Sequence, residues 1–330
     1  MSVKRKGLIW LIVFPVIVLS VLLTALHLEK KGGEPERGVP TQDVGKLRRV
    51  AYNGKIYREK PALTSILLIG TDRAEGSSGY GARQGGQADF LMLLVIDDQE
   101  KAVHQLQIDR DTIAAVEALG VLGNPVGTKN MQICLAHAFG ATPEENCLSV
   151  KKAVENLLEG IEIDEYLAVS MDSIAELNDA LGGVTVTLEE DLSSADPEMV
   201  RGARLTLTGG QAELLVRSRM NLGDGTNESR MRRQRTFLTA AAEALAARVR
   251  SGQESLTGFL DVIDAHATTS IPRAQLLNEL NTAYGYELLP IRTLEGEHTV
   301  GADGFVEFHP SPGATAGWVV DVFYEYEKEQ

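Results

Sequence analysis

Two apolar runs decide the fold of this chain: LTSILLI at residues 63–69 and FLMLLVI at residues 90–96. Each is about as long as one β-strand, and neither alternates apolar with polar side chains. We therefore expect two neighbouring strands that are buried on both faces. VHQLQI at residues 103–108 is expected to add a third strand.

Helical spacing follows these strands at residues 150–158 and 171–181, and Gly182 with Gly183 ends the second helix. Because strands and helices alternate without a second linker, we expect one α/β domain. The other expected elements are a strand at 184–188, a helix after a capping box at Thr208 and Gln211, a long helix at 230–249, a short helix at 276–280 and a hairpin at 299–308.

The first residues predict a membrane anchor. Residues 7–26 carry no charge and follow Lys4, Arg5 and Lys6. A helix of this length spans about 30 Å, the thickness of a bilayer core. The run is longer than the apolar part of a cleaved signal peptide and lacks a good cleavage site, so an uncleaved anchor is favoured. The expected order is a cytoplasmic tail at 1–6, the anchor at 7–26, an extracytoplasmic linker at 27–62 and the domain at 63–330.

The composition, 44% hydrophobic and 24% charged, is that of a globular protein, and the formal net charge is −14. A chain this acidic lacks the basic footprint of a nucleic-acid-binding protein. A cluster of basic residues within it therefore needs a local reason.

Acidic residues and one arginine lie at the ends of the three expected strands: Asp72 just after the first, Asp89 just before the second, and Arg110 and Asp111 after the third. A single loop aspartate is usually a turn or cap residue. Several at the ends of successive strands indicate a site, because ligands commonly bind at strand ends in α/β sheets. The glycine-rich segment at 76–86 lacks the G-x-G-x-x-G spacing of a dinucleotide site.

Six arginines fall within residues 217–235. They could form a solvated helix face. However, Arg230, Arg233 and Gln234 share one helix face, and Arg217 and Arg219 would point the same way on an extended segment. Arginine suits bidentate contact with phosphate, at about 1.5–3 kcal/mol per charge-assisted bond. The arginines are Arg217, Arg219, Arg230, Arg232, Arg233 and Arg235.

Two further expectations concern a metal and a disulfide. Asp72 and Asp89 offer hard oxygen ligands for Mg²⁺, which commonly bridges phosphates. Cys134 and Cys147 lie 13 positions apart. In a non-reducing compartment they are expected to form a disulfide that adds roughly 3 kcal/mol.

The ordered series of motifs resembles the LytR–CpsA–Psr family over residues 63–325. The resemblance implies a domain outside the membrane that transfers a glycopolymer, such as teichoic acid or capsule, from an undecaprenyl-pyrophosphate carrier to peptidoglycan. We expect a three-layer α/β/α sandwich with a central mixed β-sheet. The motifs are LLIGTD at 67–72, GQAD at 86–89, IDRDT at 108–112, NDALGGVTV at 178–186, LTGGQAE at 207–213, VRSR at 216–219 and RMRRQ at 230–234.

The resemblance also implies roles for residues. Asp72 and Asp89 correspond to magnesium-associated carboxylates, while Asp111 either orients Arg110 or acts as a base. The catalytic set is Arg110, Asp111 and Asp89, and the pyrophosphate-binding set is Arg110, Arg217, Arg219, Arg230, Arg233, Gln234 and Gln87.

One departure keeps other functions open. Family members often have GRSDT where this chain has GQADF at 86–90, so Gln87 removes a positive charge. The alternatives are a non-catalytic polyprenyl-phosphate-binding module and a polyprenyl pyrophosphatase, both compatible with envelope regulation. A transcription regulator is opposed by the expected topology, which leaves about six residues in the cytoplasm.

Overall fold

The structure, a computed structural model, describes residues 48–72, 86–119, 125–218, 226–250, 261–262, 265–272, 275 and 285–327. The predicted anchor at 7–26 and the predicted helix at 276–280 lie outside the described residues. None of the helices in the described part combines the length and the hydropathy of a membrane span.

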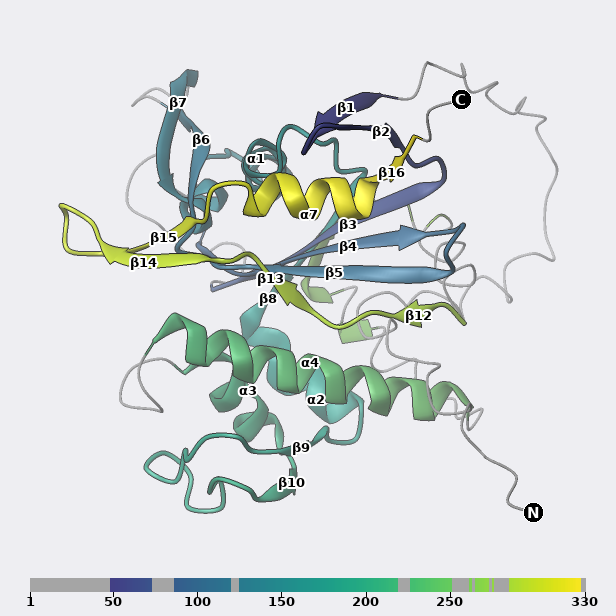
Figure 1. Cartoon of the computed structure of the whole chain (residues 1–330). Helices are drawn as coiled ribbons and strands as arrows, with labels where there is room; N and C mark the ends of the chain where they lie inside the picture. The colour runs from purple at the N-terminus through teal and green to yellow at the C-terminus, as the bar shows by residue number, and fades with distance from the viewer. Residues whose placement is uncertain are drawn as a thin grey trace, which may run out of the picture.

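A mixed sheet of seven described strands forms the centre of the molecule (Figure 1). Its middle is built by β3 (Leu63–Thr71), β4 (Ala88–Asp97) and β5 (Ala102–Ile108), each antiparallel to the next. β8 pairs with β3 in parallel and β11 follows antiparallel, while β12 and β13 pair with β5 in parallel. These outer strands are β8 (Glu165–Ser170), β11 (Ala267–Thr269), β12 (Glu287–Leu288) and β13 (Arg292–Thr293).

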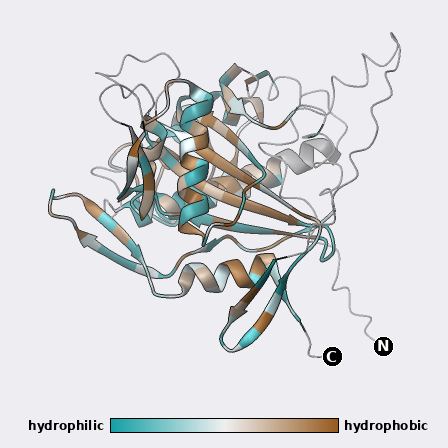
Figure 2. Ribbon diagram, turned by 90° about the horizontal axis from the view of Figure 1, so that it is seen from above, coloured by the Kyte–Doolittle hydropathy of each residue, from teal (hydrophilic) through white to brown (hydrophobic). Residues whose placement is uncertain are grey.

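Helices cover both faces of this sheet. The apolar runs of β3 and β4 divide into two cores because successive side chains point to opposite faces. Ile66 and Leu68 pack on the face of α2 (Ile174–Ala180), α3 (Gly209–Arg217) and α4 (Asn227–Arg250). Leu67 and Ile69 pack on the face of α1 (Pro143–Leu157) and α7 (Ala314–Phe323). Figure 2 shows these strands as apolar ribbons under the helices. The predicted α/β class with a central mixed sheet is confirmed.

A small antiparallel sheet includes residues 49–59, which fall within the predicted linker at 27–62. This part of the predicted linker is therefore folded. β1 (Arg49–Tyr52) and β2 (Lys55–Glu59) form a hairpin, and β16 (Tyr324–Tyr326) pairs with β2. Tyr57 packs against Tyr52 and Tyr326 with edge-to-face rings. These strands are short and partly exposed, so their pattern did not indicate a strand.

The remaining described elements are hairpins and short turns around the central sheet. Thr208 and Gln211 form the predicted capping box of α3. The elements are β6 (Ile113–Leu119), β7 (Pro125–Gln132), η3 (Ile133–Ala138), η4 (Met171–Ser173), β9 (Thr185–Thr187), β10 (Arg204–Thr206), β14 (Gly296–Val300) and β15 (Val306–Pro310).

One end of the central sheet gathers the polar residues. Because β3, β4 and β5 are successive antiparallel neighbours, the end of β3, the start of β4 and the end of β5 lie at the same edge. A bulge separates Gly70 from Thr71 there. A Cβ atom at Gly70 would lie 2.8 Å from Met171 Sδ and 2.9 Å from Phe90 Cβ, so only glycine fits this close approach.

Candidate functional site

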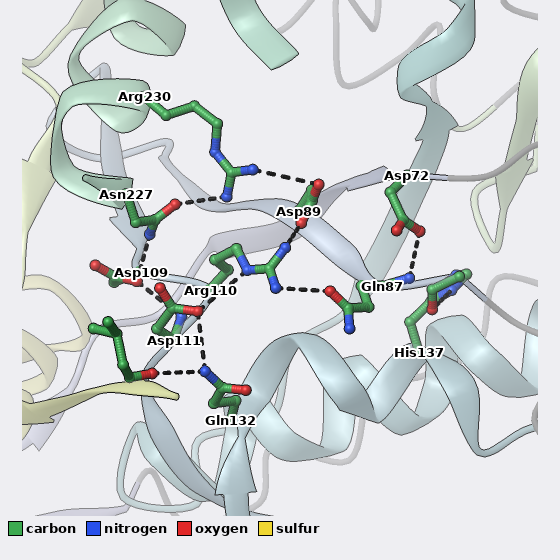
Figure 3. Close-up of polar contacts among 12 residues, drawn as sticks. Asp72, Gln87, Asp89, Asp109, Arg110, Asp111, Gln132, His137, Asn227 and Arg230 are labelled. Atoms are coloured by element: carbon green, nitrogen blue, oxygen red, sulfur yellow. Dashed lines mark hydrogen bonds and ion pairs between the residues drawn. The ribbon is translucent and has the colours of Figure 1, made fainter. Parts of the chain in front are cut away.

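Asp89 is the centre of the polar cluster at this edge. Its Oδ1 atom pairs with Arg110 Nη1, and its Oδ2 atom lies 3.4 Å from Arg230 Nη1 (Figure 3). Arg110 follows β5, whereas Arg230 lies in the first turns of α4, so two distant segments share one carboxylate. The Arg230 side chain is only 4% exposed and the Asp89 side chain 17%. Charges at this burial interact more strongly than on the surface.

Arg110 is held on three sides. Besides Asp89, its Nη2 atom donates to Gln87 Oε1 at 2.7 Å, and its Nε atom donates to Asp111 Oδ1 at 3.3 Å. The same Oδ1 atom accepts a hydrogen bond from Gln132 Nε2 at 3.2 Å, and the Asp111 side chain is 1% exposed. Two roles were left open for Asp111, and its buried contact with the guanidinium supports the one in which it orients Arg110.

Asp72 fixes the segment that carries Gln87. Its Oδ1 atom accepts from the Gln87 backbone N–H at 2.6 Å, and its own N–H donates to the Gln87 carbonyl oxygen at 3.1 Å. The buried His137 lies with Nδ1 3.2 Å from the Gly86 carbonyl oxygen. The structure therefore brings Asp72, Gln87, Asp89 and Arg110 together.

A second chain of hydrogen bonds reaches Arg230 from the other side. Asn227 Oδ1 accepts from Arg230 Nη2 at 2.6 Å, and Asn227 Nδ2 donates to Asp109 Oδ1 at 2.6 Å. His298 Nε2 lies 2.9 Å from Asp109 Oδ2. The sequence motifs included Asp109 in IDRDT but did not single it out, and Asn227 and His298 were missed. The one signal in the sequence that could have indicated Asn227 is its position one helical turn before Arg230.

Arg233 performs a different task from Arg230. It is 4% exposed and donates to the Leu215 and Ser218 carbonyl oxygens, to Ser229 Oγ at 2.7 Å and to Glu190 Oε2 at 2.6 Å. Burial alone would raise the pKa of Glu190, but hydrogen bonds from Ser229 and Arg233 lower it below the ordinary glutamate value. In this structure Arg233 ties α4 to the end of α3 and to Glu190.

The remaining predicted pyrophosphate-binding residues contact other groups or lie outside the described residues. Gln234 is buried and donates to the Val216 carbonyl oxygen at 3.3 Å. The Arg217 side chain is 33% exposed and pairs with Asp172 and, at 2.9 Å, with Glu213. Arg219 lies outside the described residues.

The predicted disulfide is wrong, because Cys134 and Cys147 are both buried and are not joined by a disulfide. Cys134 belongs to η3, and its N–H donates to the Arg110 carbonyl oxygen at 3.2 Å, whereas Cys147 belongs to α1 and packs in the core. A sequence spacing does not bring two sulfur atoms to bonding distance. Burial raises the pKa of the Cys134 thiol to about 11.

A separate acidic group lies at the far end of the sheet. Within the described residues, Asp97, Glu100 and His104 are the one trio of His, Cys, Asp or Glu side chains close enough to share an ion. Lys60 Nζ already lies 3.1 Å from Asp97 and 2.8 Å from Glu100. The ammonium group compensates these carboxylates, so the trio is part of an ion-pair network that is buried at Asp97 and exposed at Glu100.

A small hollow lies beside the Glu190–Arg233 pair. Its apolar wall is formed by Leu188, Leu192 and Leu215.

The side chains at the site define its chemical class. Four carboxylates, from Asp72, Asp89, Asp109 and Asp111, outnumber the two guanidinium groups of Arg110 and Arg230. The molecule is an α/β protein with a mixed acidic and arginine site at one sheet edge, a combination suited to a phosphate group together with a cation.

The family model described as the LytR_cpsA_psr family matches residues 29–307. The chain belongs to this LytR–CpsA–Psr family.

Two curated relatives share this similarity. The polyisoprenyl-teichoic acid–peptidoglycan teichoic acid transferase TagU of Halalkalibacterium halodurans is 29% identical over 220 residues, covering 66% of this chain and 64% of the relative. Biofilm regulatory protein A of Streptococcus mutans is 28% identical over 254 residues, covering 74% and 59%. The matched part of the chain thus spans about 60% of the length of these relatives.

A solved structure supports the fold. Protein gbs0355 from Streptococcus agalactiae superposes with a TM-score of 0.64 at 21% identity, covering 79% of this chain and 86% of that one.

Proposed function

We propose that this protein is a phosphotransferase that moves a glycopolymer from an undecaprenyl-pyrophosphate carrier to peptidoglycan. The observation that carries the proposal is the Asp89 carboxylate shared by Arg110 and Arg230. Each guanidinium can exchange this carboxylate for a phosphate oxygen of similar geometry. The 29% identical relative named as a teichoic acid transferase supports the same reaction class.

The reaction forms one phosphate ester and breaks one phosphoanhydride. A hydroxyl oxygen of the glycan attacks the phosphorus next to the polymer, and the bond from that phosphorus to the bridging oxygen breaks. The polymer–phosphate is thereby linked to the glycan oxygen. The lipid monophosphate leaves with the electron pair of the broken bond, and the hydroxyl proton passes to water. Arg110 and Arg230 stabilise negative charge on the phosphoryl oxygens, and Asp111 keeps Arg110 in position.

We propose Mg²⁺ as the cofactor. The excess of carboxylates over guanidinium groups at the site fits a divalent cation, and Mg²⁺ is commonly held by one or two carboxylates together with phosphates and water. Asp72 and Asp89 would hold it. When bound, it would neutralise charge on the pyrophosphate.

We propose that the protein is a single-pass membrane protein with residues 1–6 in the cytoplasm and the domain outside. The apolar run at 7–26 and the preceding basic residues support this orientation. An anchor would keep the site near its membrane-bound donor and raise the effective concentration. Protease treatment of intact cells should remove the domain, whereas full protection would contradict the proposed topology.

The decisive experiment is turnover by the purified full chain with a lipid-pyrophosphate-linked glycopolymer, a peptidoglycan acceptor and Mg²⁺. Arg110→Ala should lower turnover about 100-fold, the loss typical when one charge-stabilising group is removed. Arg292→Ala is the matched control, because Arg292 is 54% exposed and pairs with Asp321. Equal turnover of Arg110→Ala and wild type would overturn the site assignment.

Gln87 supports a second candidate, a non-catalytic module that binds polyprenyl phosphates. Its Oε1 atom accepts a hydrogen bond from Arg110, where family members often place another arginine. A binding module would retain lipid and show no product. A pyrophosphatase would release polymer phosphate into solution instead of linking it to the glycan, so analysis of the products separates all three functions.

A further inference from the structure

His298 lies far from the site motifs in sequence but is joined to them by hydrogen bonds. It belongs to β14 (Gly296–Val300), and its Nε2 atom lies 2.9 Å from Asp109 Oδ2. Its side chain is 35% exposed, whereas the Asp109 side chain is 6% exposed. The ring also packs against Phe308, with centroids 4.9 Å apart. The imidazole therefore has one side in solvent and one side on a buried carboxylate.

The β14–β15 hairpin is fixed to the site edge at several points. Phe308 N–H donates to the Asp111 carbonyl oxygen at 2.8 Å, and Gln132 Nε2 bridges Asp111 and the Val306 carbonyl oxygen. Thr112 forms a β-bridge with Phe308. The contact between His298 and Asp109 is therefore part of an extended junction between the hairpin and the site edge.

Asp109 fixes the orientation of the Asn227 side-chain amide. Asp109 Oδ1 accepts from Asn227 Nδ2 at 2.6 Å and from Asp111 N–H at 2.8 Å. An acceptor at Asp109 requires the NH₂ group of Asn227 to face it, which leaves the Asn227 oxygen facing Arg230. That oxygen accepts from Arg230 Nη2, while Arg230 Nη1 faces Asp89. The direction of the Arg230 guanidinium thus depends on Asp109.

We propose that His298 is a positioning residue that acts through Asp109 and Asn227 to aim Arg230, and that its charge state tunes pyrophosphate binding. The proposal rests on the proposed function. A charged imidazolium offsets the Asp109 carboxylate and holds it as an acceptor, whereas a neutral imidazole donates one weaker hydrogen bond. Histidine side chains are the ones that ordinarily change charge between pH 5 and 8.

The charged neighbours of His298 are few among the described residues. From the end of β5 it faces Asp109, and from the first turns of α4 the nearest linked groups are Asn227 and Arg230. On the hairpin, strand alternation places Glu297, Glu307 and His309 on the opposite face, where His309 lies 3.1 Å from Glu307.

The test measures binding of farnesyl pyrophosphate with Mg²⁺ to the full chain by calorimetry at pH 5.5 and 8.0. The ratio of the dissociation constants of His298→Gln and wild type cancels the ionisation of the ligand. We expect this ratio to be about 10 at pH 5.5 and about 3 at pH 8.0, in keeping with one lost charge-assisted bond. His309→Gln is the matched control and should give a ratio of about 1 at both values.

A paired substitution separates positioning from general damage to the fold. Asn227→Asp places two carboxylates face to face and should weaken binding at least about tenfold. Adding Asp109→Asn turns an amide NH₂ toward the new carboxylate at position 227 and removes this repulsion, although the same position then loses the hydrogen bond from Asp111 N–H. The double variant should therefore recover part of the loss and bind at least about threefold more tightly than Asn227→Asp. In that double variant, His298→Gln should no longer cause a pH-dependent loss.

Two results would overturn the inference: His298→Gln indistinguishable from His309→Gln, or a double variant that binds no better than Asn227→Asp. If Asn227→Asp does not fold, the two histidine variants decide alone. Wild type that fails to bind farnesyl pyrophosphate with Mg²⁺ would overturn the proposed function and this inference with it. Binding that is lost in Arg110→Ala but unchanged in His298→Gln would overturn this inference alone.

Discussion

Arg230 and Arg233 lie one turn apart on α4 and are almost equally buried, yet their surroundings differ. Arg230 contacts an aspartate and an asparagine at the sheet edge, whereas Arg233 donates to two backbone carbonyl oxygens, a serine and Glu190. Backbone carbonyl oxygens cannot leave when a ligand binds, but a shared carboxylate can exchange one arginine contact for phosphate. The partners of a buried arginine, more than its burial, indicate whether it supports the fold or binds a ligand.

Arg233→Ala should produce the largest effect on stability. It removes one partner of a buried pair and leaves Glu190 and the backbone oxygens poorly satisfied, which should cost about 3–5 kcal/mol of unfolding free energy. Denaturant unfolding of the full chain measures this. A variant that is fully stable but inactive would reverse the roles assigned to the two arginines.

Arg230→Ala should reduce turnover strongly and stability only modestly. Turnover should fall about 100-fold, because a group that stabilises phosphoryl charge is lost. The free energy of unfolding should fall by less than half as much as in Arg233→Ala, since Asp89 keeps its pair with Arg110. Turnover and denaturant unfolding measured on the same preparation check both parts.

Glu190→Gln should have a smaller effect that depends on pH. The pKa of Glu190 is lowered in the folded protein, so its carboxylate contributes stability above the unfolded pKa, and this contribution is lost as the pH falls through the folded pKa. We expect wild type to lose this part of its stability as the pH falls below about 4.5, and the variant not to lose it. Identical acid unfolding curves would contradict this.

Arg217→Ala should have the smallest effect on stability, under about 1 kcal/mol, because its partners are largely exposed. Its proposed contact with pyrophosphate requires it to leave Asp172 and Glu213. Binding of farnesyl pyrophosphate should weaken about threefold, as for one partly screened charge. Unchanged binding would confine the arginine site to the Asp89 cluster.

The convergence of Asp72, Asp89 and Arg110 follows from the sequence, because two apolar runs and the alternating segment at 103–108 predict neighbouring strands whose ends meet. The different roles of Arg230 and Arg233 do not follow from the sequence. Helical periodicity places both on one face but gives no information on what that face contacts. Asp109 meets partners 118 and 189 positions away, a separation that no local pattern encodes.

The short sheet β1–β2–β16 brings the first and last described residues of the domain together, with Arg49 Nη2 2.6 Å from Glu327 Oε1, close to where β3 begins. The nine residues of β3 separate this corner from Asp72 by roughly 30 Å. A reporter dye or affinity tag attached at Glu327 would therefore lie near the point where the chain enters the domain and well away from Asp72 and Arg110. Single-molecule tethers attached at Arg48 and Glu327 could hold the domain at this corner and leave the opposite end of the central sheet accessible to substrate.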